Sequence, residues 1–218
     1  MADTTPGDGA GSPNTNPLDF TGCVALARWL TTTGFFDLEE AMALQALVKT
    51  LPPGAKVAEL GTFQGRSSVA LAGVLPPGGE LHCVDHFEGA LLQPGQTRPP
   101  VAETVRANLA ALEANLKLFG LTGRIKVHVS RTTDAAARFA DASLHLIYVD
   151  AGHDYASVRA DLAAWYPKLA PGGFLVCDDY EEKWPGVIRA VDETGLPGRL
   201  IAPSLWAHRR PPAPSPPS

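Results

Sequence analysis

The chain has 218 residues, of which 45% are apolar and 19% charged, a balance typical of a globular domain with a complete hydrophobic core. Its net charge of −5 makes nucleic acid an unexpected partner, because phosphate backbones require a basic surface. No apolar run reaches the ~18 residues of a membrane span, and the first residues lack the features of a secretory signal. We therefore expect a cytoplasmic protein with no membrane partner.

Proline, glycine and small polar residues fill both ends of the chain. Residues 1–17 and 209–218 carry too few apolar side chains to offset the entropy of ordering, so we predict two disordered tails. Residues 18–50 carry two helical patterns and are predicted to form an N-terminal helical extension. Residues 51–208 are predicted to form the main domain.

In the main domain, short apolar runs alternate with helical patterns. The runs are almost continuously apolar, which is typical of strands that are covered on both faces. This alternation predicts an α/β fold with a mostly parallel central sheet and helices on both faces. The predicted strands are 56–60, 81–85, 126–130, 144–150 and 173–178, with 199–202 and 205–208 closing the sheet. The predicted helices are 20–31, 38–49, 67–75, 101–119, 132–139, 155–169 and 185–193.

The first strand leads into a turn that contains two glycines, Gly61 and Gly65, which would let the backbone approach a ligand closely. The turn matches neither the G-x-G-x-x-G dinucleotide motif nor the phosphate-binding P-loop. Glu59 would repel a pyrophosphate and suits a cationic ligand such as S-adenosylmethionine, with its ammonium and sulfonium groups. Thr62 and Ser67 are further candidate cofactor contacts, and Ser67 is also a candidate helix N-cap. A turn without a ligand is the alternative.

The second strand ends in Asp85, 26 residues after Glu59. A carboxylate at this position can accept hydrogen bonds from both hydroxyls of a ribose. Taken alone, Asp85 would suit NAD as well, or would be a solvated turn residue. His86 follows it and is a candidate contact of the cofactor.

Three carboxylates fall at the ends of the fourth and fifth strands: Asp150, Asp178 and Asp179. If these strands are neighbours, the carboxylates converge and raise one another's pKa. A hard divalent cation such as Mg²⁺ would remove the repulsion, because it prefers oxygen ligands. The alternative is that the acids only bond nearby turns and helix N-termini. Asp150 is a candidate contact of the cofactor as well as of the metal.

His153 follows Asp150 by three residues, in the loop that leads into the helix predicted from residue 155. The ordinary pKa of an imidazole, near 6.5, suits a general base. Asp154 is the rival catalytic base, although its carboxylate could instead cap the helix. A purely structural loop is the third possibility.

Together these motifs resemble the class I S-adenosylmethionine-dependent methyltransferases, over about residues 40–195. The greatest similarity is to the branch that contains macrolide-sugar and aminocoumarin O-methyltransferases and cephalosporin hydroxylase-like proteins. The matching motifs are Glu59-x-Gly61-x-x-x-Gly65, Val84-Asp85, residues 147–155, Pro171-Gly172-Gly173 and Cys177-Asp178-Asp179-Tyr180.

The resemblance implies a Rossmann-like fold and S-adenosylmethionine bound by Glu59, Gly61 and Asp85, with Ser130 and Thr132 near the adenine. It implies Mg²⁺ at the three strand-end acids and a small-molecule acceptor, such as a natural product, sugar or phenol of secondary metabolism. The chain could also be a homo-oligomer. Two other functions stay open: a cofactor-binding protein of the same fold with a hydroxylase-like or isomerase-like activity, and a nicotinamide-dependent oxidoreductase. The missing dinucleotide motif and the presence of Glu59 count against the nicotinamide-dependent oxidoreductase.

Overall fold

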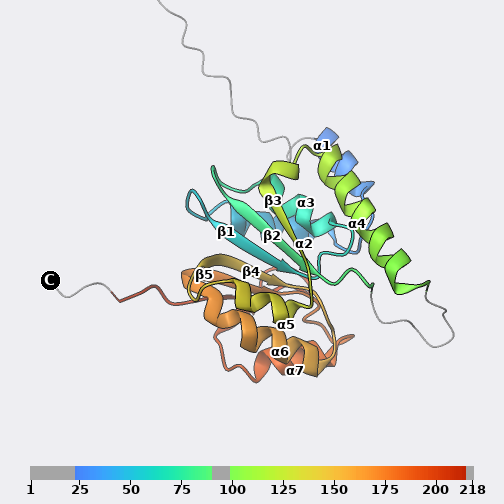
Figure 1. Cartoon of the computed structure of the whole chain (residues 1–218). Coiled ribbons are helices and arrows are strands. Elements are labelled where there is room, and N and C mark those ends of the chain that lie inside the picture. Colours follow the sequence, from blue (N-terminus) through green and yellow to red (C-terminus); the bar gives the residue numbers. More distant parts are fainter. Residues whose placement is uncertain (1–22, 90–98, 215–218) are drawn as a thin grey trace, which may run out of the picture.

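The computed structural model describes residues 23–89 and 99–214, and these form a three-layer α/β sandwich (Figure 1). The predicted tail 1–17 lies outside the described residues. The strands are β1 (Lys56–Leu60), β2 (Glu80–Asp85), β3 (Ile125–Val129), β4 (Leu144–Val149), β5 (Leu169–Cys177), β6 (Gly198–Leu200) and β7 (Trp206–Arg209).

All seven strands form one sheet in the order β3-β2-β1-β4-β5-β7-β6. The first five are parallel, whereas β7 runs antiparallel to both β5 and β6. The mostly parallel sheet predicted from the apolar runs is therefore confirmed. The order reverses between β1 and β4, and this switch point is where ligands bind in open α/β sheets.

Helices cover both faces of the sheet. They are α1 (Cys23–Leu30), α2 (Leu38–Val48), α3 (Arg66–Gly73), α4 (Val101–Leu118), α5 (Thr132–Ala135), α6 (Tyr155–Trp165) and α7 (Pro185–Asp192), with short 3-10 helices at Thr122–Arg124, Ala136–Arg138 and Tyr166–Lys168. Figure 1 shows α1 to α4 on one face and α5 to α7 on the other. Among the described residues, no helix is long and apolar enough to cross a bilayer.

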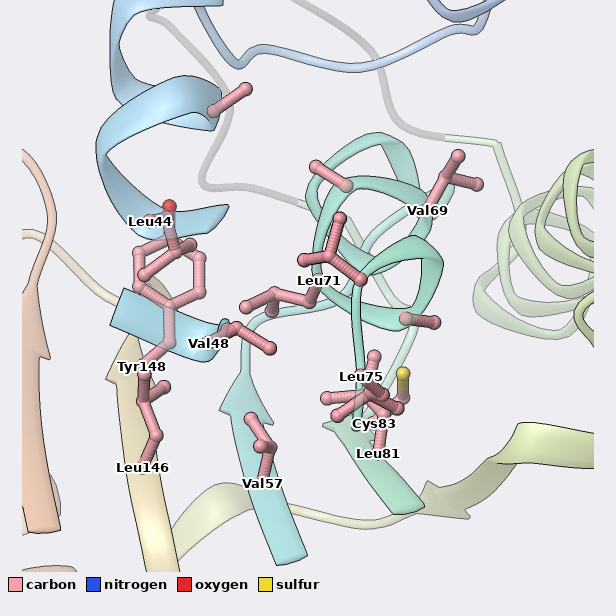
Figure 2. Close-up of a cluster of buried hydrophobic side chains, with 14 of the residues drawn as sticks. Leu44, Val48, Val57, Val69, Leu71, Leu75, Leu81, Cys83, Leu146 and Tyr148 are labelled. Carbon is pink, nitrogen blue, oxygen red and sulfur yellow. The ribbon is translucent and has the colours of Figure 1, made fainter. Parts of the chain in front are cut away.

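Strand alternation divides the core into two apolar layers. Val57 and Leu146 point to the layer that packs under α2 and α3, and Figure 2 shows them facing Val48 and Leu71. Ile147, one residue further along β4, points to the opposite layer, under α6 and α7. Burial on both faces explains why the strand sequences are nearly continuously apolar.

Most predicted bounds differ from the structure by a few residues, and two of the differences change the account of the sheet. The fifth strand, predicted to begin at residue 173, begins at Leu169, so Pro171 and Gly172, residues typical of turns, lie inside β5, which pairs irregularly with β4 near Leu144. Residue 209 was predicted to start the C-terminal tail, but Arg209 belongs to β7 and the Arg210 backbone amide donates to the Gly173 carbonyl at 2.9 Å. Residues 215–218 of the predicted tail lie outside the described residues. Backbone pairing to a neighbouring strand orders a segment that is itself not apolar.

Candidate functional site

The candidate site lies where β1, β2, β4 and β5 end side by side. Backbone hydrogen bonds join these ends: Gly61 N donates to Val84 O at 2.9 Å, and Asp150 N donates to Leu60 O at 2.8 Å. Asp178 N in turn donates to Val149 O at 3.0 Å. The glycine turn and the strand-end acids are therefore held at one edge of the sheet.

The glycines of the turn adopt conformations that favour glycine, with φ of +91° at Gly61 and +86° at Gly65. A Cβ at Gly61 would lie 1.9 Å from Asp150 O, and one at Gly65 would lie 2.3 Å from Leu112 Cδ1 in α4. Both glycines are thus required by contacts within the protein, where the sequence suggested close approach of a ligand. The turn is clamped between the loop after β4 and helix α4.

Glu59 is fully buried beneath the turn. Its Oε2 accepts hydrogen bonds from the hydroxyls of Ser68 and Thr62 and from the Cys83 thiol. Its Oε1 has no partner among the described residues. Burial raises the pKa of Glu59 to about 6, and the hydrogen bonds from Ser68, Cys83 and Thr62 limit the rise.

Two predicted cofactor contacts therefore face inward. Thr62 is buried with its hydroxyl on Glu59. Ser67 lies inside α3, whose N-cap is Gly65, so the N-cap prediction for Ser67 is wrong. An N-cap residue has a non-helical backbone, whereas Ser67 is already the second residue of α3, and Gly65 starts the helix from a left-handed conformation.

Asp85 joins the glycine turn to the segment after β2. Its Oδ2 accepts from Phe63 N at 2.7 Å, and its Oδ1 accepts from Phe87 N at 2.6 Å. His86 is exposed and accepts from Glu88 N at 2.9 Å through Nδ1. Ser130 N donates to Asp85 O at 2.9 Å, which brings the end of β3 to the same edge.

Thr132 points away from this edge. Its hydroxyl donates to Asp161 Oδ1 in α6, and its carbonyl accepts from Trp165 Nε1 at 3.1 Å. The Thr132 side chain thus fastens α5 to α6.

Asp150, His153 and Asp179 meet beyond the ends of β4 and β5, with one ligand atom of each within 4.8 Å of the others. His153 Nε2 lies 2.7 Å from Asp179 Oδ2 and 3.8 Å from Asp150 Oδ1. The His153 ring packs on Trp184, with ring centroids 4.4 Å apart. We call Asp150, Asp178, Asp179 and His153 the acid centre.

Asp178 lies deeper than the other three. Its Oδ2 accepts from the Tyr148 hydroxyl, and its Oδ1 accepts from Asp179 N at 2.8 Å and lies 3.2 Å from Ser204 Oγ. The Tyr148 hydroxyl also lies 3.3 Å from Asp150 Oδ2, so it links the two carboxylates.

Burial and mutual repulsion dominate the electrostatics of the acid centre. Burial and the charge of Glu40 raise the pKa of Asp178 to about 7, while burial and the charge of Asp178 hold the pKa of Asp150 well above its usual range. The carboxylates of Asp150 and Asp179 raise the pKa of His153 to about 10. Without another cation, His153 is therefore the positive charge of this centre at neutral pH.

Asp154, the rival base, is the N-cap of α6. Its Oδ1 accepts from Ala156 N at 3.1 Å and Ser157 N at 3.0 Å, and the Ser157 hydroxyl donates to Oδ2. These hydrogen bonds lower the pKa of Asp154. The side chain is exposed and is not part of the Asp150, His153 and Asp179 group.

The donor set fits a divalent cation. Carboxylate oxygens are the ligands of hard cations such as Mg²⁺ and Mn²⁺, and an imidazole broadens the choice toward transition metals such as iron, nickel and zinc. The turn fits a cationic cofactor, because Glu59 Oε1 is a buried acceptor to which no described residue donates, and Asp85 stands at the next strand end. Glu40, Tyr148 and Ser204 were missed from sequence. Of these three, only Tyr148 could have been found from the sequence. It lies two residues before Asp150, and side chains two apart along a strand point to the same face.

A sheet of this order, with the glycine turn after β1 and acids after β2, β4 and β5, has the fold of a class I methyltransferase. A family profile described as "Methyltransferase domain" matches residues 58–180, more than half of the chain. The chain belongs to this family and is a methyltransferase.

Solved structures share the fold at low identity. The O-methyltransferase NovP aligns with a TM-score of 0.64 and 18% identity over 80% of each chain. The O-methyltransferase TomG from Streptomyces achromogenes aligns at 0.59 and 17% over 82% of each chain. An O-methyltransferase from Bacillus cereus aligns at 0.59 and 16% over 93% of this chain and 94% of that one. No curated protein sequence matches the chain.

Proposed function

We propose that the chain transfers the methyl group of S-adenosylmethionine to a hydroxyl oxygen of a small molecule, with the help of a divalent cation. The observation that carries the proposal is the acid centre beside the glycine turn, at the switch point of the sheet. NovP, TomG and the Bacillus cereus protein are O-methyltransferases, and the last two were solved with S-adenosylmethionine and S-adenosylhomocysteine respectively.

The cofactor would be held by the turn after β1 and the acids around it. Asp85 would bind the ribose through the lone pairs that the Phe63 and Phe87 amides leave free. Glu59 would supply negative charge beneath the turn, close to the cationic part of the cofactor. Gly61, Gly65, Thr62 and Ser67 would shape the turn, while His86 and Ser130 would border the adenine side. Thr132 would act there only indirectly, because its hydroxyl donates to Asp161 in α6. S-adenosylmethionine supplies an electrophilic methyl group on a sulfonium.

The cation would be held by Asp150 and Asp179, with Asp178 behind them as the third carboxylate. A bound cation supplies Lewis acidity and lowers the pKa of a hydroxyl beside it. The protein's contribution is to hold the acceptor oxygen in line with the methyl group, and such positioning can account for much of the acceleration. In the transfer, the O–CH₃ bond forms as the S–CH₃ bond breaks, and the hydroxyl proton must go to a base.

We propose His153 as the base. Asp154 is the alternative, but its side chain is exposed and caps helix α6. The His153 Nε2 atom lies 2.7 Å from Asp179 Oδ2, so the imidazole contacts the acid centre directly. In the ion pair it holds a proton and cannot accept another. Neutralisation of the neighbouring carboxylates would return the imidazole toward its ordinary pKa and free it to act.

We also propose that residues 18–50 act as an extension of the catalytic domain 51–208. Trp29 Nε1 donates to Arg66 O at 3.0 Å, and Phe36 packs against Tyr148 with ring centroids 5.9 Å apart. These contacts support an extension that would lie beside both the turn and the acid centre. A cytoplasmic location, a role in natural-product metabolism and a homo-oligomeric state belong to the same proposal.

Methyl transfer tests the function directly. The protein is incubated with methyl-labelled S-adenosylmethionine and a panel of catechols, phenols and sugars, with Mg²⁺ or with excess EDTA. Label should reach an acceptor oxygen with Mg²⁺, and EDTA should abolish it. Asp179→Asn should lose activity with Mg²⁺ present, whereas the exposed neighbour Glu182→Gln should keep it. Full activity in excess EDTA would rule out the cation.

A further inference from the structure

A buried chain of polar groups leads from the acid centre to helix α2. The Ser204 hydroxyl donates to Glu40 Oε1 and lies 3.2 Å from Asp178 Oδ1. Glu40, Ser204 and Asp178 are each 8% exposed. Glu40 and Ser204 are 164 positions apart, so the contact joins the start of α2 to the segment that precedes β7.

Both ends of this chain are fixed by the backbone. Asp37 N donates to Glu40 Oε2 at 3.2 Å within the capping box that starts α2. Tyr180 N donates to Ser204 O at 2.9 Å, just after the two acids that end β5. The Ser204 hydroxyl is therefore held between α2 and Asp178 with little freedom to move.

Burying a carboxylate at position 40 is energetically unfavourable. The neighbouring buried residues of α2, Ala41, Leu44 and Val48, belong to the apolar core. A buried carboxylate loses hydration and needs hydrogen bonds to offset that loss. The capping box accounts for one carboxylate oxygen, Oε2, but nothing in α2 uses the other oxygen, Oε1, which instead meets Ser204.

The number of hydrogens available for hydrogen bonding shows how the Ser204 hydroxyl affects Asp178. Ser204 carries one hydroxyl hydrogen, and its oxygen lies within hydrogen-bond distance of both Glu40 Oε1 and Asp178 Oδ1, so the hydroxyl bridges the two carboxylates. Asp178 Oδ1 also accepts from Asp179 N, and the Tyr148 hydroxyl donates to Oδ2. Each Asp178 oxygen thus faces a fixed donor, so the carboxylate keeps one orientation toward Asp150 and Asp179.

We propose that Glu40 and Ser204 are positioning residues of the acid centre, and that Glu40 acts through Ser204 to orient Asp178 for cation binding. The inference rests on the proposed cation-dependent function. It ties the N-terminal extension to that centre, because Glu40 is set in place by the first turn of α2. Partners that orient metal ligands in this way typically change metal affinity by about 10- to 100-fold when they are mutated.

Mn²⁺ binding to the full-length protein, followed by electron paramagnetic resonance, tests the proposal. The variants are Glu40→Gln, which removes the charge and keeps the shape, and Ser204→Ala, with Ser204→Thr as the variant that keeps the hydroxyl. Glu39→Gln is the matched control, because Glu39 is exposed in the same turn of α2. S-adenosylhomocysteine affinity and thermal unfolding are measured on every variant.

Glu40→Gln and Ser204→Ala should weaken Mn²⁺ binding by about tenfold or more, with S-adenosylhomocysteine affinity within about twofold of the parent. Ser204→Thr and Glu39→Gln should bind Mn²⁺ like the parent. If Ser204→Ala does not fold, Glu40→Gln decides the matter. Unchanged Mn²⁺ affinity in Glu40→Gln would overturn this inference and leave the proposed function intact. A parent protein that binds S-adenosylhomocysteine but no Mn²⁺ would overturn both this inference and the cation in the proposed function.

Discussion

His153 Nε2 lies 2.7 Å from Asp179 Oδ2, so a residue of the loop after β4 forms an ion pair with a residue at the end of β5. Both belong to an acid centre in which Asp150 and Asp178 are largely withdrawn from water. The imidazolium offsets part of the repulsion between these carboxylates. A cation bound to these carboxylates would repel the positive charge of the His153 imidazolium. The protonation of His153 therefore reports whether a cation is bound at the acid centre.

We predict that Mg²⁺ lowers the pKa of His153. In the cation-free protein this pKa is about 10 because of the Asp150 and Asp179 carboxylates, and a cation on those carboxylates would oppose protonation. Titration of the imidazole protons by NMR, with and without Mg²⁺, measures the change. An identical pKa in saturating Mg²⁺ would show that no cation binds beside His153.

The same pKa gives a pH-dependent contribution to stability. The folded pKa of about 10 exceeds the unfolded value of about 6.5, so the ion pair stabilises the protein fully below pH 6.5 and is lost as the pH rises toward 10. In EDTA, His153→Gln should therefore lower the melting temperature at pH 6 and have progressively less effect up to pH 10. The exposed His86→Gln is the control, and a pH-independent effect of His153→Gln would contradict the prediction.

Asp161 should destabilise the protein at neutral pH. It is 2% exposed, and burial raises its pKa to about 6 despite the hydrogen bond from Thr132. Because the folded pKa lies above the unfolded value, the folded state loses stability as the pH rises from about 4 to 6. Asp161→Asn removes the charge and keeps an acceptor for Thr132.

The melting temperature of Asp161→Asn relative to the parent should therefore rise between pH 4 and pH 7. The shift of roughly two pKa units sets an upper bound of about 3 kcal/mol on this gain. Asp134→Asn, at an exposed position of α5, is the control. A constant difference across this pH range would show that Asp161 titrates normally.

Gly61→Ala should be far more damaging than Gly120→Ala. Both glycines have positive φ, +91° and +67° respectively, which costs an alanine about 1–2 kcal/mol. A Cβ at Gly61 would in addition lie 1.9 Å from Asp150 O, whereas a Cβ at Gly120 would meet nothing within 4 Å. Urea unfolding of both variants measures the difference, and equal losses of stability would contradict the close contact between the turn and the loop after β4.

Much of the fold followed from the strand sequences. The bounds predicted for the first strand, 56–60, are those of β1, because continuous burial leaves an apolar run with sharp ends. The start of β5 was missed because Pro171, Gly172 and Gly173 carry a turn signal that pairing with β4 overrides. Local propensity is a weak guide where a neighbouring strand supplies the hydrogen bonds.

The acid centre was only partly predictable. Asp150 and Asp179 could be placed together because parallel neighbours end at one edge of a sheet, and His153 because it is near Asp150 along the chain. Glu40 and Ser204 could not, since they come from distant segments and have no spacing that marks them. Asp154 could be read as either cap or base, and its hydrogen bonds to the α6 amides favour the cap.

Titration calorimetry with S-adenosylhomocysteine is the most direct test of the central claim that this edge of the sheet binds the methyl donor. We expect one binding site per chain. Asp85→Ala should weaken binding by about 10-fold or more, as expected for the loss of hydrogen bonds to a charged group. Asp178→Asn should bind nearly as well as the parent. Failure of the parent to bind S-adenosylhomocysteine, or binding of NADH in its place, would contradict the account.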